Sequence, residues 1–130
     1  MDAVHAILIC DDDADTRAAL RRALRGHHVT EAATPSEGLA ALRAARFDAV
    51  VSDFRFGPGE GDGLDFLQTV CLQWPATVRV LLSGSPDLEL ASRAVAGGAV
   101  DRYVRKPWTP DALRATLELV LQRRGDGDLR

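Results

Sequence analysis

The most informative run of this sequence is FDAVVSD, residues 47–53. It is mostly apolar until it ends in Asp53, as expected for a strand that helices cover on both faces. A second run, AILIC at residues 6–10, ends in the same way at Asp11-Asp12-Asp13. Open α/β folds place their sites at the carboxyl edge of the sheet, so two adjacent parallel strands would bring these carboxylates together there.

Carboxylates packed this closely repel one another. At ~4 Å each like-charge pair costs roughly 4 kcal/mol at an effective dielectric of ~20. A hard divalent cation relieves that repulsion, and an acidic, all-oxygen site with few protein ligands suits Mg²⁺. The sequence therefore predicts Mg²⁺ beside a reactive aspartate, Asp53.

Composition narrows the class of protein. The 130 residues suffice for one domain with a substantial core, and the formal net charge of −3 gives no reason to expect nucleic acid or an anionic membrane as a partner. Cys10 and Cys71 lie in apolar stretches without metal-ligand spacing, which favours two buried, reduced thiols. The N-terminus lacks the pattern of a leader peptide and no run approaches membrane-spanning length, which predicts a cytoplasmic protein.

Apolar strands alternate with amphipathic helices along the chain, the pattern of a parallel sheet wrapped by helices. We expect strands at 6–10, 28–32, 48–52, 78–82 and 100–104. We expect helices at about 15–25, from Thr34-Pro35, at about 64–73, from Ser85-Pro86 to Gly97-Gly98, and from Thr109-Pro110. The sequence thus predicts a (βα)₅ chain.

Three local signals place the remaining boundaries. Thr34-Pro35-Ser36-Glu37 is a capping box with proline at the first helical position. Residues 54–63 contain four glycines and one proline, which predicts a loop directly after Asp53. The glycine-rich residues 125–130 predict a flexible C-terminal tail, so that the domain itself would span residues 1–124.

The fourth and fifth strands also end in reactive side chains. Ser83, before Gly84, places a hydroxyl at the end of one strand, and Lys106, before Pro107, places an ammonium at the end of the other. Together with the acids, this edge offers a carboxylate nucleophile, a metal site, and hydroxyl and cationic partners for phosphoryl oxygens. The set predicts phosphoryl transfer.

These residues resemble a known family, the receiver domains of two-component response regulators. The resemblance covers about Ala6 to Leu121 and rests on the following residues, each at an expected strand end: Asp11-Asp12, Asp53, Ser83, Tyr103 and Lys106-Pro107. It implies a doubly wound, flavodoxin-like (βα)₅ sandwich with a parallel sheet in the order 2-1-3-4-5. It also implies a signalling module rather than a metabolic enzyme.

The resemblance implies a role for each residue at this edge. Asp53 would be the phosphoacceptor, with the Mg²⁺ ligands being Asp12, Asp11 through water, Asp53, and the backbone carbonyl of Arg55. Lys106 would pair first with Asp53 and then with the phosphoryl group.

The resemblance further implies a switch. Ser83 would move onto the phosphoryl group, and Tyr103 would turn into the space that the hydroxyl leaves, changing the surface of the fourth helix, fifth strand and fifth helix. The implied partners are a sensor histidine kinase or phosphotransfer protein upstream, and an effector protein or covalently linked output domain downstream. Dimerisation upon phosphorylation is a further expectation, whereas direct contact with nucleic acid or membrane is not expected.

The sequence departs from the family pattern in three places. The loop after Asp53 is longer than usual and its proline is displaced to Pro58, serine replaces the commoner threonine at position 83, and Trp108 follows Lys106-Pro107. Trp108 is more typical of receivers attached to signalling enzymes or hybrid kinases than of those joined to DNA-binding domains.

Three other functions compete with this interpretation. A pseudo-receiver would bind proteins without needing phosphate. A phosphatase of the haloacid dehalogenase type would need an acid at position 55, where this chain has arginine, and a cap domain. A flavodoxin-like cofactor binder would need a hydroxyl-rich loop after the first strand, where this chain has acids.

Overall fold

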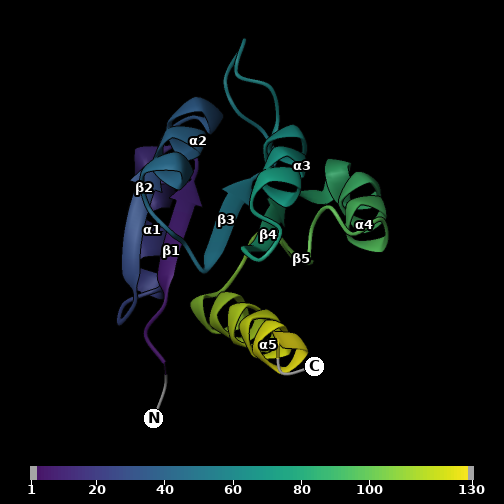
Figure 1. Ribbon diagram of the computed structural model, residues 1–130. Helices are drawn as coiled ribbons and strands as arrows, with labels where there is room; N and C mark the ends of the chain where they lie inside the picture. Colours follow the sequence, from purple (N-terminus) through teal and green to yellow (C-terminus); the bar gives the residue numbers. More distant parts are fainter. Residues whose placement is uncertain (1–2, 129–130) are drawn as a thin grey trace.

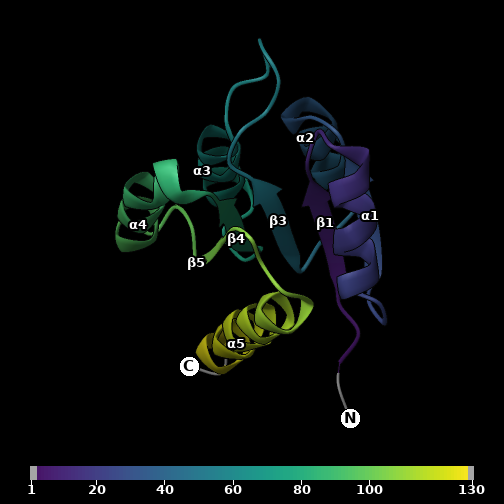
Figure 2. The ribbon, with the colours of Figure 1, turned by 180° about the vertical axis from the view of Figure 1, so that it is seen from behind.

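A computed structural model of the chain describes residues 3–128 and shows a parallel five-stranded sheet between two layers of helices (Figures 1 and 2). The strand order is β2-β1-β3-β4-β5, so the predicted fold class is confirmed. The strands are β1 (Ala6–Cys10), β2 (His28–Ala32), β3 (Ala49–Asp53), β4 (Val78–Ser83) and β5 (Arg102–Arg105).

The helices cover the sheet on both faces. On one face α1 and α5 share a core with alternate strand residues such as Ile9 and Val51, and on the other α2, α3 and α4 pack against residues such as Leu8 and Val50. The helices are α1 (Ala14–Ala23), α2 (Pro35–Ala44), α3 (Gly63–Gln73), η1 (the 3-10 turn Ser85–Asp87), α4 (Leu88–Ala96) and α5 (Pro110–Asp128). Within the described residues, no helix combines the length and apolar character needed to cross a membrane.

Local sequence signals explain most helix starts. The side chain of Thr34 accepts a hydrogen bond from the backbone N–H of Glu37 at 3.1 Å, which confirms the predicted capping box. Thr109 caps α5 in the same way, accepting from the N–H of Ala112 at 3.1 Å. Asp13 and Asp62 cap α1 and α3.

The predicted starts of α4 and β5 are wrong. Ser85 does not cap α4, because residues 85–87 form a separate 3-10 turn and Asp87 occupies the N-cap position. β5 begins at Arg102 and not at residue 100, because the N–H groups of Ala99 and Val100 bond to the carbonyl of Ala94 at the end of α4.

The C-terminal helix is longer than expected. α5 continues to Asp128, where the sequence predicted a flexible tail from residue 125. An established helix gains one hydrogen bond for each residue that it adds. This gain offsets the low helix propensity of the glycines after residue 124. Residues 129 and 130 lie outside the described part of the chain, and the domain boundary at 124 stays a prediction.

The two cysteines differ in burial. Both are free, as predicted, and Cys10 is buried in the core between β1 and α2. Burial raises the pKa of the Cys10 thiol to about 12, so it stays protonated. Cys71 is only half-buried on α3, which corrects the expectation of two buried thiols.

Candidate functional site

Three carboxylates meet at the carboxyl edge of the sheet. Asp11 and Asp12 follow β1, and Asp53 ends β3. The pairing of Cys10 with Ser52 in the adjacent strands explains why the acids that follow lie together. Asp11, Asp12 and Asp53 each offer an oxygen atom within 4.8 Å of the others, as the sequence predicted for an acidic cluster.

Asp53 is held at the centre of this edge. It is only 7% exposed, and its Oδ1 atom accepts hydrogen bonds from the backbone N–H of Phe54 at 2.9 Å and from Nζ of Lys106. The backbone N–H of Lys106 donates to the carbonyl of Ser83 at 2.9 Å, which fixes the start of the lysine arm beside β4. Among the described residues, no hydrogen bond ends on Oδ2 of Asp53, so that oxygen is free to accept one.

Asp11 is the most perturbed acid of the cluster. It is 2% exposed, and burial raises the pKa of its carboxyl from 3.8 to about 6. The hydrogen bond from the N–H of Asp13, at 2.8 Å, and the nearby Lys106 lower this pKa, whereas the charges of Asp53 and Asp12 raise it. The Asp11 carboxyl is therefore close to half-protonated in mildly acidic solution.

The donor set suits a hard divalent cation. Three carboxylate oxygens within 4.8 Å are the ligand type that Mg²⁺ prefers, and the exposed Asp12 leaves one side of the cluster open to water. Lys106 is bonded to Asp53, and the charges of Asp53 and Asp12 add to burial in raising the pKa of Asp11. The residues present therefore fit a magnesium site.

Ser83 ends β4, and Tyr103 lies on β5. The Ser83 hydroxyl is buried and donates to the carbonyl of Gly84 at 3.3 Å. Tyr103 is half-buried and packs against the core that α2, α3 and α4 cover, with Leu81 as its neighbour on β4. Their predicted switch roles stay predictions.

The loop after Asp53 contains a contact that sequence reasoning missed. Arg55 donates from Nε to Oδ2 of Asp87 at 2.8 Å and from Nη2 to Oδ1 at 2.6 Å. This pairing raises the pKa of the Arg55 guanidinium. The partners are 32 positions apart, and no spacing rule links a loop arginine to an acid at the start of a later helix.

A close backbone approach was also missed. A Cβ atom on Gly63 would lie 1.9 Å from the carbonyl oxygen of Asp53, so only glycine fits at this first residue of α3. The N–H of Gly63 also donates to the carbonyl of Phe54 at 2.6 Å, which closes the base of the long loop. The expected loop glycine thus has a specific task, to let α3 start against the end of β3.

Arg55 is further fixed by its backbone, which forms an isolated antiparallel bridge with Asp62. The loop between these two residues projects from the carboxyl edge of the sheet in both ribbon views (Figures 1 and 2). The role of the Arg55 carbonyl as a metal ligand stays a prediction.

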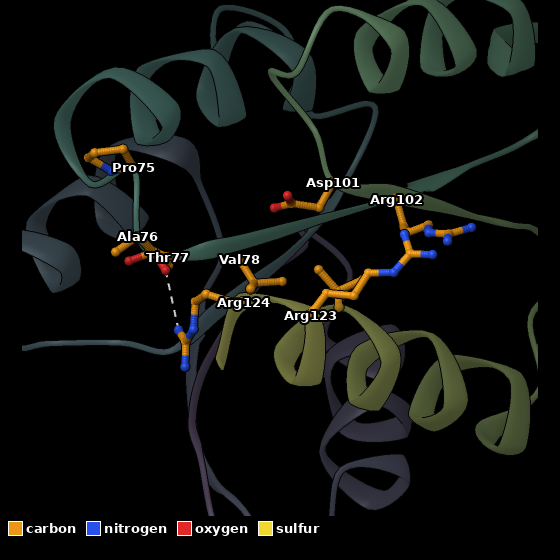
Figure 3. Close-up of a pocket in the computed structure, with 9 residues that line it drawn as sticks. Pro75, Ala76, Thr77, Val78, Asp101, Arg102, Arg123 and Arg124 are labelled. Atoms are coloured by element: carbon orange, nitrogen blue, oxygen red, sulfur yellow. Dashed lines mark hydrogen bonds between the residues drawn. The ribbon is translucent and has the colours of Figure 1, made fainter. Parts of the chain in front are cut away.

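A separate pocket opens at the opposite edge of the sheet. Its volume is about 260 Å³, and it lies between the starts of β4 and β5 and the last part of α5 (Figure 3). Its Arg124 side chain is already used by the fold, since Nη1 donates to the carbonyls of Asp48 at 2.9 Å and Ala76 at 3.2 Å. The acid cluster and not this pocket therefore carries the candidate chemistry.

Comparison with known proteins agrees with this geometry. A family model described as "Response regulator receiver domain" matches residues 7–118. The chain belongs to this family. Receiver domains are the phosphorylated signalling domains of two-component systems, and the family binds Mg²⁺ at an acidic pocket, here represented by the aspartate cluster.

Curated relatives of this receiver domain are transcriptional regulators. It is 32% identical over 130 residues to "Hydrogenase transcriptional regulatory protein HoxA" of Cupriavidus necator, covering 98% of this chain and 27% of the relative. It is 34% identical over 115 residues to "C4-dicarboxylate transport transcriptional regulatory protein DctD" of Rhizobium meliloti, covering 87% of this chain and 24% of the relative. The chain therefore spans about a quarter of the length of these relatives.

A solved structure shows the same fold. The signal receiver domain of an HD domain-containing protein from Pseudomonas fluorescens Pf-5 superposes with a TM-score of 0.87 at 27% identity, covering 100% of this chain and 96% of that one. Receivers of proteins with different names thus match this chain. The interpretation of Trp108 stays a prediction.

Proposed function

We propose that this receiver domain is a phosphoacceptor, which takes a phosphoryl group from the phosphohistidine of a sensor kinase or phosphotransfer protein onto Asp53. The single observation that carries the proposal is the hydrogen bonding of the Asp53 carboxylate. Lys106 and the N–H of Phe54 both hold Oδ1, which leaves Oδ2 as the attacking atom. A positioned carboxylate with one uncommitted oxygen is suited to nucleophilic attack on phosphorus.

The transfer exchanges one bond for another. Oδ2 of Asp53 forms a bond to phosphorus while the bond between phosphorus and the donor's imidazole nitrogen breaks, and its electron pair stays with that nitrogen. The phosphoryl group brings about two negative charges to the sheet edge. Lys106 is placed to follow this charge, because its ammonium already lies against Asp53.

The acid cluster would hold the metal that this chemistry needs. Asp11, Asp12 and Asp53, with the backbone carbonyl of Arg55, are the proposed ligands of Mg²⁺. When bound, Mg²⁺ neutralises charge on the transferring phosphoryl oxygens. Asp11 would act on it through water and as a carboxylate, so the proton that it carries in mild acid must leave first.

Ser83 would complete the switch. Among the described residues its hydroxyl donates to the adjacent Gly84 carbonyl at 3.3 Å, a long hydrogen bond. Moving the hydroxyl to a phosphoryl oxygen would therefore break a weak local contact. A contact made in one state and not in the other is what a switch requires. Tyr103 would respond on β5, altering the surface of α4, β5 and α5 for an effector protein, a linked output domain or a second copy of the chain.

Intact-mass spectrometry after treatment with acetyl phosphate tests the proposal. We expect a gain of one phosphoryl group that requires Mg²⁺ and is lost in Asp53→Asn. Asp65→Asn is the matched control, because Asp65 is an acid on α3 outside the cluster. A chain that gains no Asp53-dependent mass would instead be a pseudo-receiver.

A further inference from the structure

The loop after Asp53 is tied to the start of α4 by one ion pair. Nε of Arg55 donates to Oδ2 of Asp87 at 2.8 Å, and Nη2 donates to Oδ1 at 2.6 Å. The Arg55 side chain is 70% exposed, whereas that of Asp87 is only 6% exposed. The arginine side chain is therefore accessible to solvent and to other anions, whereas the buried carboxylate cannot be left without a partner.

Asp87 occupies a capping position without capping. The N-cap residues Asp13, Thr34 and Asp62 all have extended backbones with ψ between 118° and 171°, and each side chain accepts a backbone N–H of its helix. Asp87 has ψ 4° and no such bond, although aspartate is among the best capping residues. The Asp87 carboxylate bonds to Arg55 instead of to the N–H groups of α4.

Arg55 lies two positions after the proposed phosphoacceptor. A phosphoryl group on Asp53 would present three acceptor oxygens and about two negative charges to the nearby guanidinium. The planar fork of arginine matches phosphate oxygens as well as it matches a carboxylate. Before phosphorylation the guanidinium bonds to Asp87 and lies near the charge of Asp62. A phosphoryl group on Asp53 would add a new anionic partner two positions from Arg55.

We infer that Arg55 exchanges partners when Asp53 is phosphorylated: its guanidinium leaves Asp87 for the phosphoryl oxygens, and the freed Asp87 carboxylate caps α4. This exchange rests on the proposed phosphoacceptor function. The N–H groups in the first turn of α4 provide the replacement partners that a buried carboxylate needs. Arg55 is in this sense a positioning residue, which acts on α4 through Asp87.

The exchange also bears on Ser83. Asp87 follows Ser83 by four positions and is the last residue of η1. Capping requires the backbone of Asp87 to change from ψ 4° toward the extended value of the other N-caps, which moves this short segment. The Arg55–Asp87 pair therefore opposes the movement of Ser83 until a phosphoryl group competes for the arginine.

A titration with beryllofluoride and Mg²⁺, monitored by amide NMR, measures the coupling between the Arg55–Asp87 pair and the Asp53 site. Asp87→Asn removes the charge that holds Arg55 but keeps a residue that caps equally well. We expect this substitution to lower the beryllofluoride concentration at the midpoint of the titration about fivefold or more. A fivefold change is at the lower end of the usual coupling between two sites. In an Arg55→Gln background, Asp87→Asn should change the midpoint by less than about twofold, as for independent substitutions.

Two controls keep the test specific. Glu89→Gln removes one negative charge from the same end of α4 but leaves the Arg55–Asp87 pair intact, so its midpoint should match that of the unmodified chain. Capping should also shift the amide protons of Glu89 and Leu90 downfield on adding beryllofluoride, and Asp87→Ala should abolish that shift. Neither effect is expected of a pair that only stabilises the fold.

The outcomes separate this inference from the function on which it rests. An unmodified chain that binds beryllofluoride, with Asp87→Asn acting equally in both backgrounds or in neither, overturns the exchange alone. If beryllofluoride and Mg²⁺ do not change the amide spectrum of the unmodified chain, both the phosphoacceptor function and the exchange are overturned.

Discussion

Lys106 and the backbone N–H of Phe54 donate to the same oxygen of Asp53, Oδ1. The two donors come from different parts of the chain, one just after β5 and one from the residue next to Asp53. Their convergence fixes the carboxylate while it is still unmodified. The ammonium also reduces the repulsion between Asp53 and its acidic neighbours.

Lys106→Met tests the structural part of this role. Charged hydrogen bonds contribute about 1.5–3 kcal/mol, so we expect the free energy of unfolding at pH 7 to fall by a value near the lower end, since Lys106 is 38% exposed. Urea unfolding measures the change. In an Asp53→Asn background the same substitution should lower the free energy of unfolding much less. An equal decrease in both backgrounds would show that Lys106 does not stabilise the fold through Asp53.

Asp11→Asn should stabilise the protein at neutral pH. The folded-state pKa of Asp11, about 6, lies above its ordinary value of 3.8, so the folded chain binds more protons than the unfolded chain between these two values. Stability from this group therefore falls as pH rises from about 4 to 6, and the charged carboxylate costs about 3 kcal/mol at pH 7, at 1.36 kcal/mol per pKa unit.

Urea unfolding at pH 4 and pH 7 measures this linkage. The gain from Asp11→Asn should appear at pH 7 and shrink toward pH 4, where Asp11 of the unmodified chain is already protonated. Asp15→Asn is a suitable control, because Asp15 is an exposed acid in the first turn of α1. A gain of equal size at both pH values would contradict a raised pKa for Asp11.

Much of this site was predictable because its residues follow strands. The apolar runs before Asp11 and Asp53 specify parallel strands, and parallel strands bring their ends to one edge. Lys106 was predictable for the same reason, at the end of β5. The sequence therefore predicts which residues gather, since topology does most of the positioning.

Other contacts depend on details that no periodic pattern carries. Arg79 looks misplaced in a buried strand, yet it is 6% exposed and donates to the carbonyls of Thr77 at 2.7 Å and Ala99 at 2.9 Å. The Arg55–Asp87 pair likewise joins side chains whose approach depends on the fold of two loops. Such pairings become visible only once the backbone is placed.

Mg²⁺ should raise the thermal midpoint of the folded chain at pH 7.5. A ligand at 100 times its Kd stabilises by about 2.7 kcal/mol if it binds only the folded state. The gain should diminish at pH 5.5, because Asp11, with its pKa of about 6, must then lose a proton to bind the metal. Differential scanning calorimetry with and without Mg²⁺ measures both effects.

Two substitutions make the magnesium prediction specific to the cluster. Asp12→Asn should remove most of the gain, because Asp12 supplies one of the three clustered oxygens. Asp13→Asn should retain it, because Asp13 caps α1 and asparagine caps as well as aspartate. Equal responses of the two variants would place any bound Mg²⁺ elsewhere.

Gly63→Ala should damage the site from the α3 side. The new Cβ would lie 1.9 Å from the carbonyl oxygen of Asp53, a backbone atom that can yield only if the end of β3 moves. Overpacking of this kind costs about 1–3 kcal/mol, and here it also displaces the proposed phosphoacceptor.

Gly57→Ala is the matched control in the same loop, since its Cβ would meet only Oδ2 of Asp12 at an ordinary 3.9 Å. We expect Gly63→Ala to lower both the urea midpoint and the rate of labelling by acetyl phosphate, while Gly57→Ala leaves the urea midpoint close to that of the unmodified chain. If the two variants unfold at the same urea concentration, the tight approach of α3 to β3 is not a feature of the folded chain.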